Sequence, residues 1–256
     1  MVHIVGAGCG AADLITLRGK RLIEEADVLI YAGSLVNPEL LSYAREGCEL
    51  HDSAKMTLEE IFEVIGEAEK AGKTTVRLHS GDPSLYGAIG EQMRAFDERG
   101  IAYDITPGVS AFAGAAAALK TEYTLPGVTQ SVIITRAAGK TSVPEAENLA
   151  SLASHGTTMV LFLSAGLLDR VTKELTEGGL SPDTPAAIVC RASWPDETIC
   201  RCTVGTLEAA ARENGITKTA LIVVGGVLDS AFERSRLYDP NFATEFRGIR
   251  DGGKSE

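Results

Sequence analysis

Several residue types and motifs are scarce in this chain of 256 residues. Its five cysteines (Cys9, Cys48, Cys190, Cys200 and Cys202) are an odd, scattered set without a CxxC pair, and its four histidines are equally dispersed. Zinc cages and thioredoxin-type redox centres need closely spaced ligands or thiols. We therefore expect no metal site and no redox centre.

Positive charge is also scarce, since 24 Lys and Arg face 35 Asp and Glu for a net charge of −11. Nucleic-acid and membrane-surface partners need an extended basic face, so both are disfavoured, whereas a few clustered arginines would suffice for an anionic small ligand. No apolar run reaches the ~18 residues of a membrane span. The chain opens on a predicted strand without a basic and apolar leader, so we expect a cytoplasmic protein.

Motifs of nucleophilic and metal-dependent hydrolysis are absent as well. The sequence contains neither G-x-S-x-G nor HExxH, and no pair of carboxylates suited to a catalytic dyad. A reaction that needs little protein nucleophile is favoured by default. Alkyl transfer from an already activated donor meets that description.

The chain alternates predicted strands and helices along its whole length, which is typical of parallel or mostly parallel sheets. In the first half, strands are expected at 2–5, 28–31, 48–51, 74–79 and 102–105. Helices are expected at 14–25, 38–44, 58–70, 85–99 and 110–119. Asp13 and Thr57 are the expected N-caps of the first and third helices, because a short side-chain oxygen accepts the free amide hydrogens of a first turn.

The second half repeats the alternation after a predicted linker at 119–128, which contains Pro and Gly and has no periodicity. Strands are expected at 131–135, 158–163, 186–190, 197–203 and 219–224, and helices at 145–154, 166–177 and 206–214. Residues 192–197 are typical of a turn that joins two strands directly, which indicates a mixed sheet.

The sequence thus predicts two α/β domains with an active-site cleft between them. Residues 1–118 form the first, with a parallel sheet, and residues 129–234 form the second, with a mixed sheet. The tail at 235–256 has no clear pattern, and we expect 251–256 to be disordered.

Three glycine-rich junctions follow predicted strands of the first domain: Gly6–Gly10, Gly81–Gly87 and Thr106–Ala111. Open α/β sheets bind ligands beyond the carboxyl ends of their strands. A Rossmann NAD site is disfavoured, because the third glycine is displaced and no carboxylate ends the strand at 28–31. A P-loop would need a lysine in the turn, so an adenosine ligand fits better than a polyphosphate. The alternative is that each junction is only a tight turn.

The segments at 5–19, 81–87 and 106–111 resemble motifs of the tetrapyrrole methyltransferases, and the resemblance runs over residues 2–228. It implies a two-domain α/β enzyme, a homodimer, that transfers a methyl group from S-adenosylmethionine to an anionic tetrapyrrole and releases S-adenosylhomocysteine. Residues 31–36 are similar to the branch that methylates C-11 of precorrin-4 in cobalamin biosynthesis. Cobalt-precorrin-4 is the corresponding substrate of the anaerobic route.

The resemblance also implies which residues contact the methyl donor. These are mostly small: Cys9, Ser80, Gly81, Asp82, Leu85, Ser110, Ala111, Leu163, Ala192 and Ala220. The family's first loop usually reads G-x-G-P-G-D-P, whereas here Cys9 replaces the proline and Ala11-Ala12 replaces Asp-Pro. Contacts in this loop are therefore expected from the backbone, which any residue supplies.

Catalytic and substrate-binding residues follow from the same reasoning. Tyr31 and Asp82 are the catalytic candidates, to position or polarise the reactants. A substrate with many carboxylates calls for cationic side chains along its trough. The candidates are Lys55, Arg136, Lys140, Arg191 and the nearby Arg201, and the alternative for each is a solvated surface charge.

Other functions remain open at this point. One alternative is a methyltransferase of the same fold that acts on another ring carbon, for example of uroporphyrinogen III or precorrin-2/3. Another is a methyltransferase of this fold with another substrate, as diphthine synthase and an rRNA methyltransferase have. The charge of −11 speaks against RNA. A binding module for a nucleotide or tetrapyrrole is the non-catalytic alternative, and it would form a complex without adding a methyl group.

Overall fold

A computed structural model of the chain describes residues 1–229 and 232–248. By their contacts these residues form two compact units. The first contains residues 1–119, 189–199 and 216–221, and the second contains 120–188, 200–215 and the described residues from 222 onward. The domain limits 1–118 and 129–234 remain predictions, and the tail residues 251–256 lie outside the described residues.

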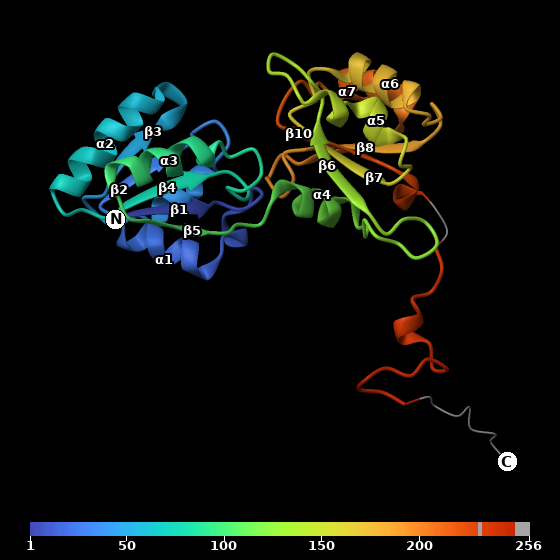
Figure 1. The fold of residues 1–256 in the computed structure, drawn as a ribbon, viewed down its shortest axis with the longest axis horizontal. Helices are drawn as coiled ribbons and strands as arrows, with labels where there is room; N and C mark the ends of the chain where they lie inside the picture. Colours follow the sequence, from blue (N-terminus) through green and yellow to red (C-terminus); the bar gives the residue numbers. More distant parts are fainter. Residues whose placement is uncertain (230–231, 249–256) are drawn as a thin grey trace. The chain divides into compact units, whose positions relative to one another are not determined.

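The first sheet is parallel throughout, as predicted (Figure 1). Its strands are β1 (Val2–Gly6), β2 (Val28–Tyr31), β3 (Glu49–Asp52), β4 (Thr75–His79) and β5 (Tyr103–Thr106), in the order β3-β2-β4-β1-β5. The register pairs Gly6 with His79 and Val5 with Thr106. The carboxyl ends of β1, β4 and β5, and the glycine-rich junctions that follow them, therefore lie at one edge of the sheet.

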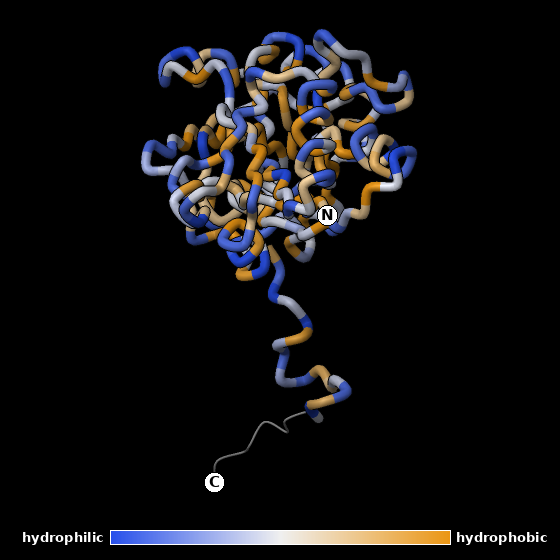
Figure 2. The backbone as a smooth tube through the Cα atoms, turned by 90° about the vertical axis from the view of Figure 1, so that its left-hand side faces the viewer, coloured by the Kyte–Doolittle hydropathy of each residue, from blue (hydrophilic) through white to orange (hydrophobic). Residues whose placement is uncertain are grey.

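Helices cover both faces of this sheet. One core cluster joins Leu22 and Ile23 of α1 (Leu17–Glu25) to the sheet, and a second joins Phe96 of α3 (Ile89–Arg99) and residues of α2 (Leu58–Lys70) to the opposite face. Figure 2 shows the apolar segments running through the interior. Burial of such side chains is the main favourable term of folding, at roughly 25 cal/mol per Å² of apolar surface.

The two core clusters show that the neighbouring strands β1 and β4 are followed by helices on opposite faces, α1 and α3. Neighbouring strands of this kind form a topological switch point, where open α/β sheets bind their ligands. The Gly6–Gly10 and Gly81–Gly87 turns both begin there. Strand order, which the sequence did not predict, thus singles out these two turns.

Two predicted helix starts are wrong. Asp13 is not the cap of the first helix, because residues 12–14 form the 3-10 turn η1 (Ala12–Leu14) and the Thr16 hydroxyl accepts the Gly19 amide hydrogen at 3.0 Å instead. The helix expected at 85–99 begins only at Ile89. Thr57 is confirmed as the cap of α2, in a reciprocal capping box with Glu60.

The late start of α3 has a backbone cause. Tyr86 and Ala88 have left-handed φ values of 57° and 50°, which an α-helix excludes. Gly87 lies so close to Pro83 that a Cβ would be 2.2 Å from the Pro83 carbonyl oxygen. The segment from Pro83 to Ala88 is therefore a compact turn at the end of β4.

The second sheet is mixed, as predicted from the turn at 192–197. Its strands are β6 (Val132–Arg136), β7 (Thr158–Phe162), β8 (Pro185–Cys190), β9 (Thr198–Thr203) and β10 (Ala220–Val224), in the order β6-β7-β10-β8-β9. Strands β6 and β7 are parallel and β7 and β10 antiparallel. The strands β8 and β9, on either side of the turn, are neighbours.

The remaining helices are short. They are α4 (Ala111–Leu119), α5 (Leu149–Ala153), α6 (Leu168–Glu177) and α7 (Leu207–Glu213), with 3-10 turns η2 (Pro38–Tyr43), η3 (Ser53–Lys55), η4 (Glu145–Glu147), η5 (Val204–Thr206), η6 (Gly226–Leu228) and η7 (Arg236–Tyr238). The segment expected as a helix at 38–44 is thus a 3-10 helix, and the helix expected at 145–154 is split into η4 and α5. No helix within the two described ranges has the length and apolarity to cross a bilayer.

The sequence predicts Asp13 as the N-cap of the first helix, whereas Thr16 caps α1 in the structure, and two substitutions distinguish these assignments. Thr16→Ala should lower the free energy of unfolding by about 1 kcal/mol, because the Gly19 amide hydrogen loses its acceptor. Asp13→Ala, the matched control, should leave it unchanged within about 0.5 kcal/mol, as is usual for surface positions. Urea denaturation of the three proteins measures this difference, and a larger loss for Asp13→Ala would contradict the assignment.

Candidate active site

The turns after β1 and β4 are joined backbone to backbone. The Gly8 amide donates to the Gly81 carbonyl at 3.2 Å, and the Gly81 amide donates back to the Gly8 carbonyl at 2.9 Å. The Ala7 amide also donates to the His79 carbonyl at 2.7 Å. These bonds make the two turns a single unit beyond the sheet edge.

The turn after β5 packs against the same place with no room for side chains. A Cβ on Gly108 would lie 2.2 Å from the Gly81 carbonyl oxygen, and one on Gly6 would lie 2.5 Å from the Gly108 nitrogen. Real Cβ atoms do not approach so closely. Gly6 and Gly108 are therefore required for contact between the turns, whereas Gly81, with a left-handed φ of 63°, is required for its backbone conformation.

Asp82 joins the second and third turns through its carboxylate. One oxygen accepts the Gly108 amide hydrogen at 2.9 Å, and the other accepts the Ser84 amide hydrogen at 2.9 Å and a short bond from the Ser84 hydroxyl. Partial burial acts to raise the pKa of Asp82, but the hydrogen bonds from Ser84 and Gly108 outweigh it, so the pKa is lowered. The carboxylate is ionised at neutral pH and holds the turns together.

A buried cationic side chain lies on β4, beneath these turns. Arg77 is 6% exposed and donates to the Ile30 carbonyl at 3.3 Å, and burial lowers its pKa to about 10. His79 is equally buried, and burial together with the Arg77 charge lowers its pKa to about 3. At neutral pH His79 is therefore uncharged, whereas Arg77 is positively charged.

The structure brings most of the predicted donor residues of the first unit together. A Cβ on Gly114 of α4 would lie 2.9 Å from the Cys9 sulfur and 3.5 Å from the Ala192 Cβ, so these residues meet. Ala111 lies at the start of α4 beside Gly81, whose added Cβ would be 3.5 Å from the Ala111 nitrogen. Ser110, Ala192 and Ala220 are buried, and Ser80 and Leu85 are half-buried in the turn after β4.

Two residues that sequence reasoning missed hold the first loop. The Asn37 side chain donates to the Gly10 carbonyl at 3.0 Å, and the Ser193 hydroxyl accepts the Ala11 amide hydrogen at 3.0 Å. Asn37 precedes Pro38 and caps η2, and this Asn-Pro pair is a signal that would have marked a turn. Ser193 is 182 positions from Ala11 and carries no local signal.

Left-handed backbone is concentrated at the predicted donor positions. Five described non-glycine residues with positive φ coincide with or adjoin them: Tyr86, Leu163, Arg191, Ser193 and Thr219. Each such residue costs roughly 1–3 kcal/mol and persists only where its surroundings impose it, typically at functional sites. Leu163 is itself a predicted contact, at the end of β7 in the second unit, and is 69% exposed despite its apolar side chain.

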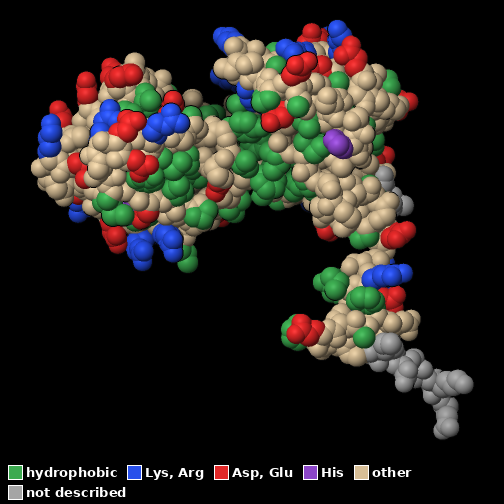
Figure 3. All heavy atoms as spheres, in the orientation of Figure 1, with side chains coloured by type: hydrophobic (Ala, Val, Ile, Leu, Met, Phe, Trp, Pro, Cys, Tyr) green, Lys and Arg blue, Asp and Glu red, His purple; other side chains and the backbone are tan. Residues whose placement is uncertain are grey.

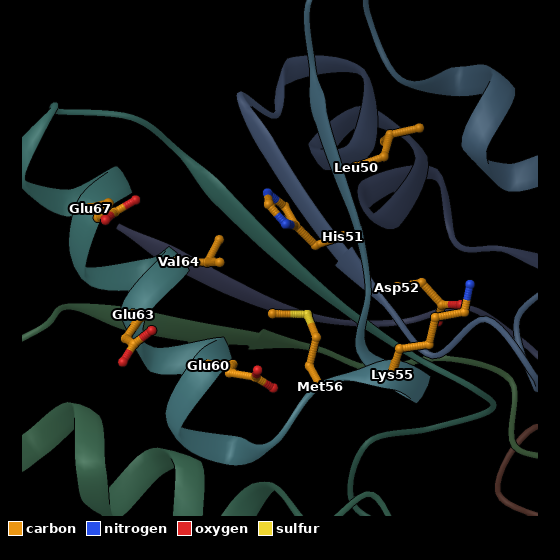
Figure 4. Close-up of a pocket in the computed structure, with 9 residues that line it drawn as sticks. All are labelled: Leu50, His51, Asp52, Lys55, Met56, Glu60, Glu63, Val64 and Glu67. Carbon is orange, nitrogen blue, oxygen red and sulfur yellow. The ribbon is translucent and has the colours of Figure 1, made fainter.

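Tyr31 lies at the carboxyl end of β2, and Lys55 lies just after the carboxyl end of the neighbouring strand β3. Tyr31 ends β2 and is half-buried against the core on the α1 side. Lys55 borders an open pocket of about 440 Å³ (Figure 4), which is lined by Leu50, His51, Asp52, Lys55, Met56, Glu60, Glu63, Val64 and Glu67. Four carboxylates around one lysine repel an anion, so this pocket does not suit an anionic tetrapyrrole.

Two other cationic candidates, Arg136 and Arg201, donate hydrogen bonds to backbone carbonyls. Arg136 donates to the Ala137, Thr141 and Ser142 carbonyls at 3.3, 3.2 and 2.6 Å, and thereby shapes the loop that carries the exposed Lys140. Those acceptors have no net charge, so Arg136 keeps its positive charge. Arg201 donates to the Leu228 carbonyl at 2.9 Å.

Arg191 differs, because it is paired with an acid. Its Nε lies 2.7 Å from the Asp196 carboxylate, and its guanidinium lies 4.1 Å from the centre of the Trp194 ring. The charge of Arg191 is thus partly neutralised within the turn between β8 and β9. The structure gives it a role in shaping that turn.

Comparison with known proteins gives a consistent result over the chain. The family model described as Tetrapyrrole (Corrin/Porphyrin) Methylases matches residues 1–208. A cobalt-precorrin-4 C(11)-methyltransferase from Methanocaldococcus jannaschii is 52% identical over 247 residues, covering 96% of this chain and 95% of that protein. A precorrin-4 C(11)-methyltransferase from Sinorhizobium sp is 47% identical over 249 residues, covering 96% and 98%.

Solved structures agree with the sequence relatives. The X-ray structure of a cobalt precorrin-4 methyltransferase of cobalamin biosynthesis superposes with a TM-score of 0.87 at 47% identity, covering 90% of this chain and 96% of the other. A uroporphyrin-III C-methyl transferase from Thermus thermophilus, complexed with S-adenosylhomocysteine, has a TM-score of 0.73 at 25% identity, covering 89% and 93%.

Because the turns pack closely, one added methyl group between them should lower the stability of the protein. Gly108→Ala should lower the free energy of unfolding by about 1–3 kcal/mol, because the Cβ forces the Gly81 and Gly108 turns apart. Gly90→Ala, at a glycine of α3 with open space around it, should be neutral or slightly stabilising. Chemical denaturation measures both, and equal stability of the two variants would show that the turns separate at no cost.

Proposed function

Because the chain belongs to the tetrapyrrole (corrin/porphyrin) methylase family, we propose that it transfers a methyl group from S-adenosylmethionine to C-11 of precorrin-4 in cobalamin biosynthesis. The observation that carries the proposal is the identity of 52% and 47%, over nearly the whole chain, to two enzymes that bear the corresponding names. We further propose that the enzyme acts in the cytoplasm.

The site geometry suits a methyl donor of this class. The donor supplies an activated methyl group on a sulfonium, so the protein has chiefly to align that methyl with the acceptor carbon. Small residues such as Cys9, Ala111 and Ala192 meet around the joined turns and leave backbone groups to hold the adenosyl part. Ser80, Leu85, Ser110 and Ala220 complete the proposed donor site in the first unit, and Leu163 is the proposed contact from the second.

Asp82 is assigned a positioning role in this proposal. Its two carboxylate oxygens accept hydrogen bonds from the Ser84 and Gly108 amides, and these bonds orient the Gly81 turn against which the donor would lie. Tyr31, at the end of β2, remains the candidate to position or polarise the substrate.

The substrate would be held by cations, because a corrinoid precursor carries many carboxylates. Arg136 is the strongest candidate, since its partners are uncharged carbonyls and its charge stays available. Lys140 lies in the same loop and is exposed. Lys55 and Arg191 remain predicted contacts with carboxylates beside them.

Cobalt-precorrin-4 is the alternative substrate, since enzymes named for it and enzymes named for precorrin-4 are both similar to this chain. Sequence identity does not separate the two substrates: two relatives named for the cobalt-containing precursor are 52% and 46% identical to this chain, on either side of the 47% of the Sinorhizobium sp enzyme. The two substrates therefore have to be compared directly. Cobalt here would belong to the substrate.

Mass spectrometry tests the reaction. With S-adenosylmethionine and either precursor, the product should gain the mass of one methyl group, and the faster reaction identifies the substrate.

Asp82→Ala should lower turnover at limiting donor, or donor affinity, by about tenfold, because the Gly81 turn loses its hydrogen bonds to the Asp82 carboxylate. Ser42→Ala, at an exposed hydroxyl on η2, is the matched control and should react like the wild type. Binding of both ligands without any gain in mass would indicate a non-catalytic binding module.

We also propose a homodimer, supported by apolar surface near the C-terminus. Five large side chains of the segment 232–246 are well exposed: Phe232, Leu237, Tyr238, Phe242 and Phe246. Figure 3 shows several hydrophobic side chains on this segment, with acidic and basic side chains beside them. Several large apolar side chains exposed on one segment are a feature that a protein interface would cover.

Light scattering tests the dimer. The wild type should have twice the mass of one chain at micromolar concentration, because the aromatic side chains would be buried against a second copy. A Phe242→Ser, Phe246→Ser variant should dissociate more readily, whereas Ser42→Ala should not. A monomeric wild type would contradict the proposal.

A further inference from the structure

The first glycine loop has few internal restraints in this chain. Residues 8–11 read Gly-Cys-Gly-Ala, without a proline, so the free backbone has many conformations to lose on folding. A loop of this composition has to be held in shape by other segments. Two of its restraints, Gly81 and Asn37, are described above, and the third is the turn at 191–197.

Ser193 is the residue through which this turn holds the loop. Its hydroxyl accepts the Ala11 amide hydrogen at 3.0 Å and lies 3.4 Å from the Cys9 sulfur. The residues on either side of Ser193 also lie close to the loop. A Cβ on Gly10 would lie 2.4 Å from the Ala192 carbonyl oxygen and 2.4 Å from the Trp194 side chain. The turn thus lies directly on the loop.

The turn at 191–197 is itself held by an ion pair and by hydrogen bonds, so it can keep the glycine loop in one conformation. The Arg191 side chain pairs with Asp196 at 2.7 Å and lies over the Trp194 ring. The Ser193 amide donates to the Glu197 carboxylate at 2.7 Å, and the Arg191 amide donates to the Thr219 carbonyl at 3.0 Å. These bonds keep Ser193 in its left-handed conformation, with a φ of 64°.

We propose that Ser193 is a positioning residue for the methyl donor, which presets the Gly8–Ala11 loop in its binding conformation. The inference rests on the proposed function, because it takes Cys9 and the backbone beside it as part of the donor site. A loop that is already ordered binds with less loss of entropy, so the hydroxyl should act on donor affinity rather than on the methyl-transfer step.

Two substitutions at Ser193 separate the hydroxyl from the backbone. Ser193→Gly removes the hydroxyl and accepts the left-handed φ without strain, whereas Ser193→Ala removes the hydroxyl and keeps the strain. Both should raise the Kd for S-adenosylhomocysteine, measured by calorimetry, and the KM for the donor by about tenfold, as expected for the loss of one partly buried hydrogen bond. The kcat at saturating donor should change by less than about twofold, since uniform binding is lost. Ser42→Ala is the matched control and should leave all three values unchanged.

Two results would contradict the positioning role of Ser193, and a third would contradict the proposed function. If Ser193→Gly binds the donor like the wild type, the hydroxyl has no positioning role and the inference is wrong, whatever Ser193→Ala does. A kcat that falls in proportion with the affinity would also overturn it. If the wild type itself fails to bind S-adenosylhomocysteine, the proposed function fails instead. Thermal unfolding of the glycine variant at the wild-type temperature shows that the protein is folded.

Discussion

Contact between three backbone turns underlies the whole candidate site. Gly6, Gly81 and Gly108 approach so closely that an added Cβ at Gly6 or Gly108 would overlap a neighbouring turn. Because the turns follow three adjacent parallel strands, this contact sets where each following segment leaves the sheet. The starts of helices α1, α3 and α4 are placed as a consequence.

Charge has a supporting role at this site. The Asp82 carboxylate accepts hydrogen bonds from the amides of Ser84 and Gly108. Burial and the positive charge of Arg77 keep the His79 side chain uncharged. Neither arrangement supplies a nucleophile. It suits a reaction whose donor is already activated, where the protein contributes alignment more than acid–base chemistry.

Much of the fold could be predicted from the sequence, because alternating apolar segments and glycine turns are local patterns. Within the described residues the ten strands lie close to their expected positions, and the parallel first sheet and mixed second sheet are confirmed. Helix starts were less predictable. Asp13 and Thr16 are both good caps, and the 3-10 turn at residues 12–14 decides between them. The turn at 83–88 has the composition of a helix start, but the left-handed φ values of Tyr86 and Ala88 exclude an α-helix there.

The candidate site shows the same division. By itself the sequence determined which residues are small, where the three glycine junctions lie, and which family the chain resembles, because all of these depend on residue identity and short-range spacing. Only the tertiary structure placed β4 beside β1, so that the first two junctions meet at a switch point, and placed Ser193 against a loop 182 positions away. Strand order and such long-range contacts follow from the packing of the whole core, which no short segment of sequence encodes.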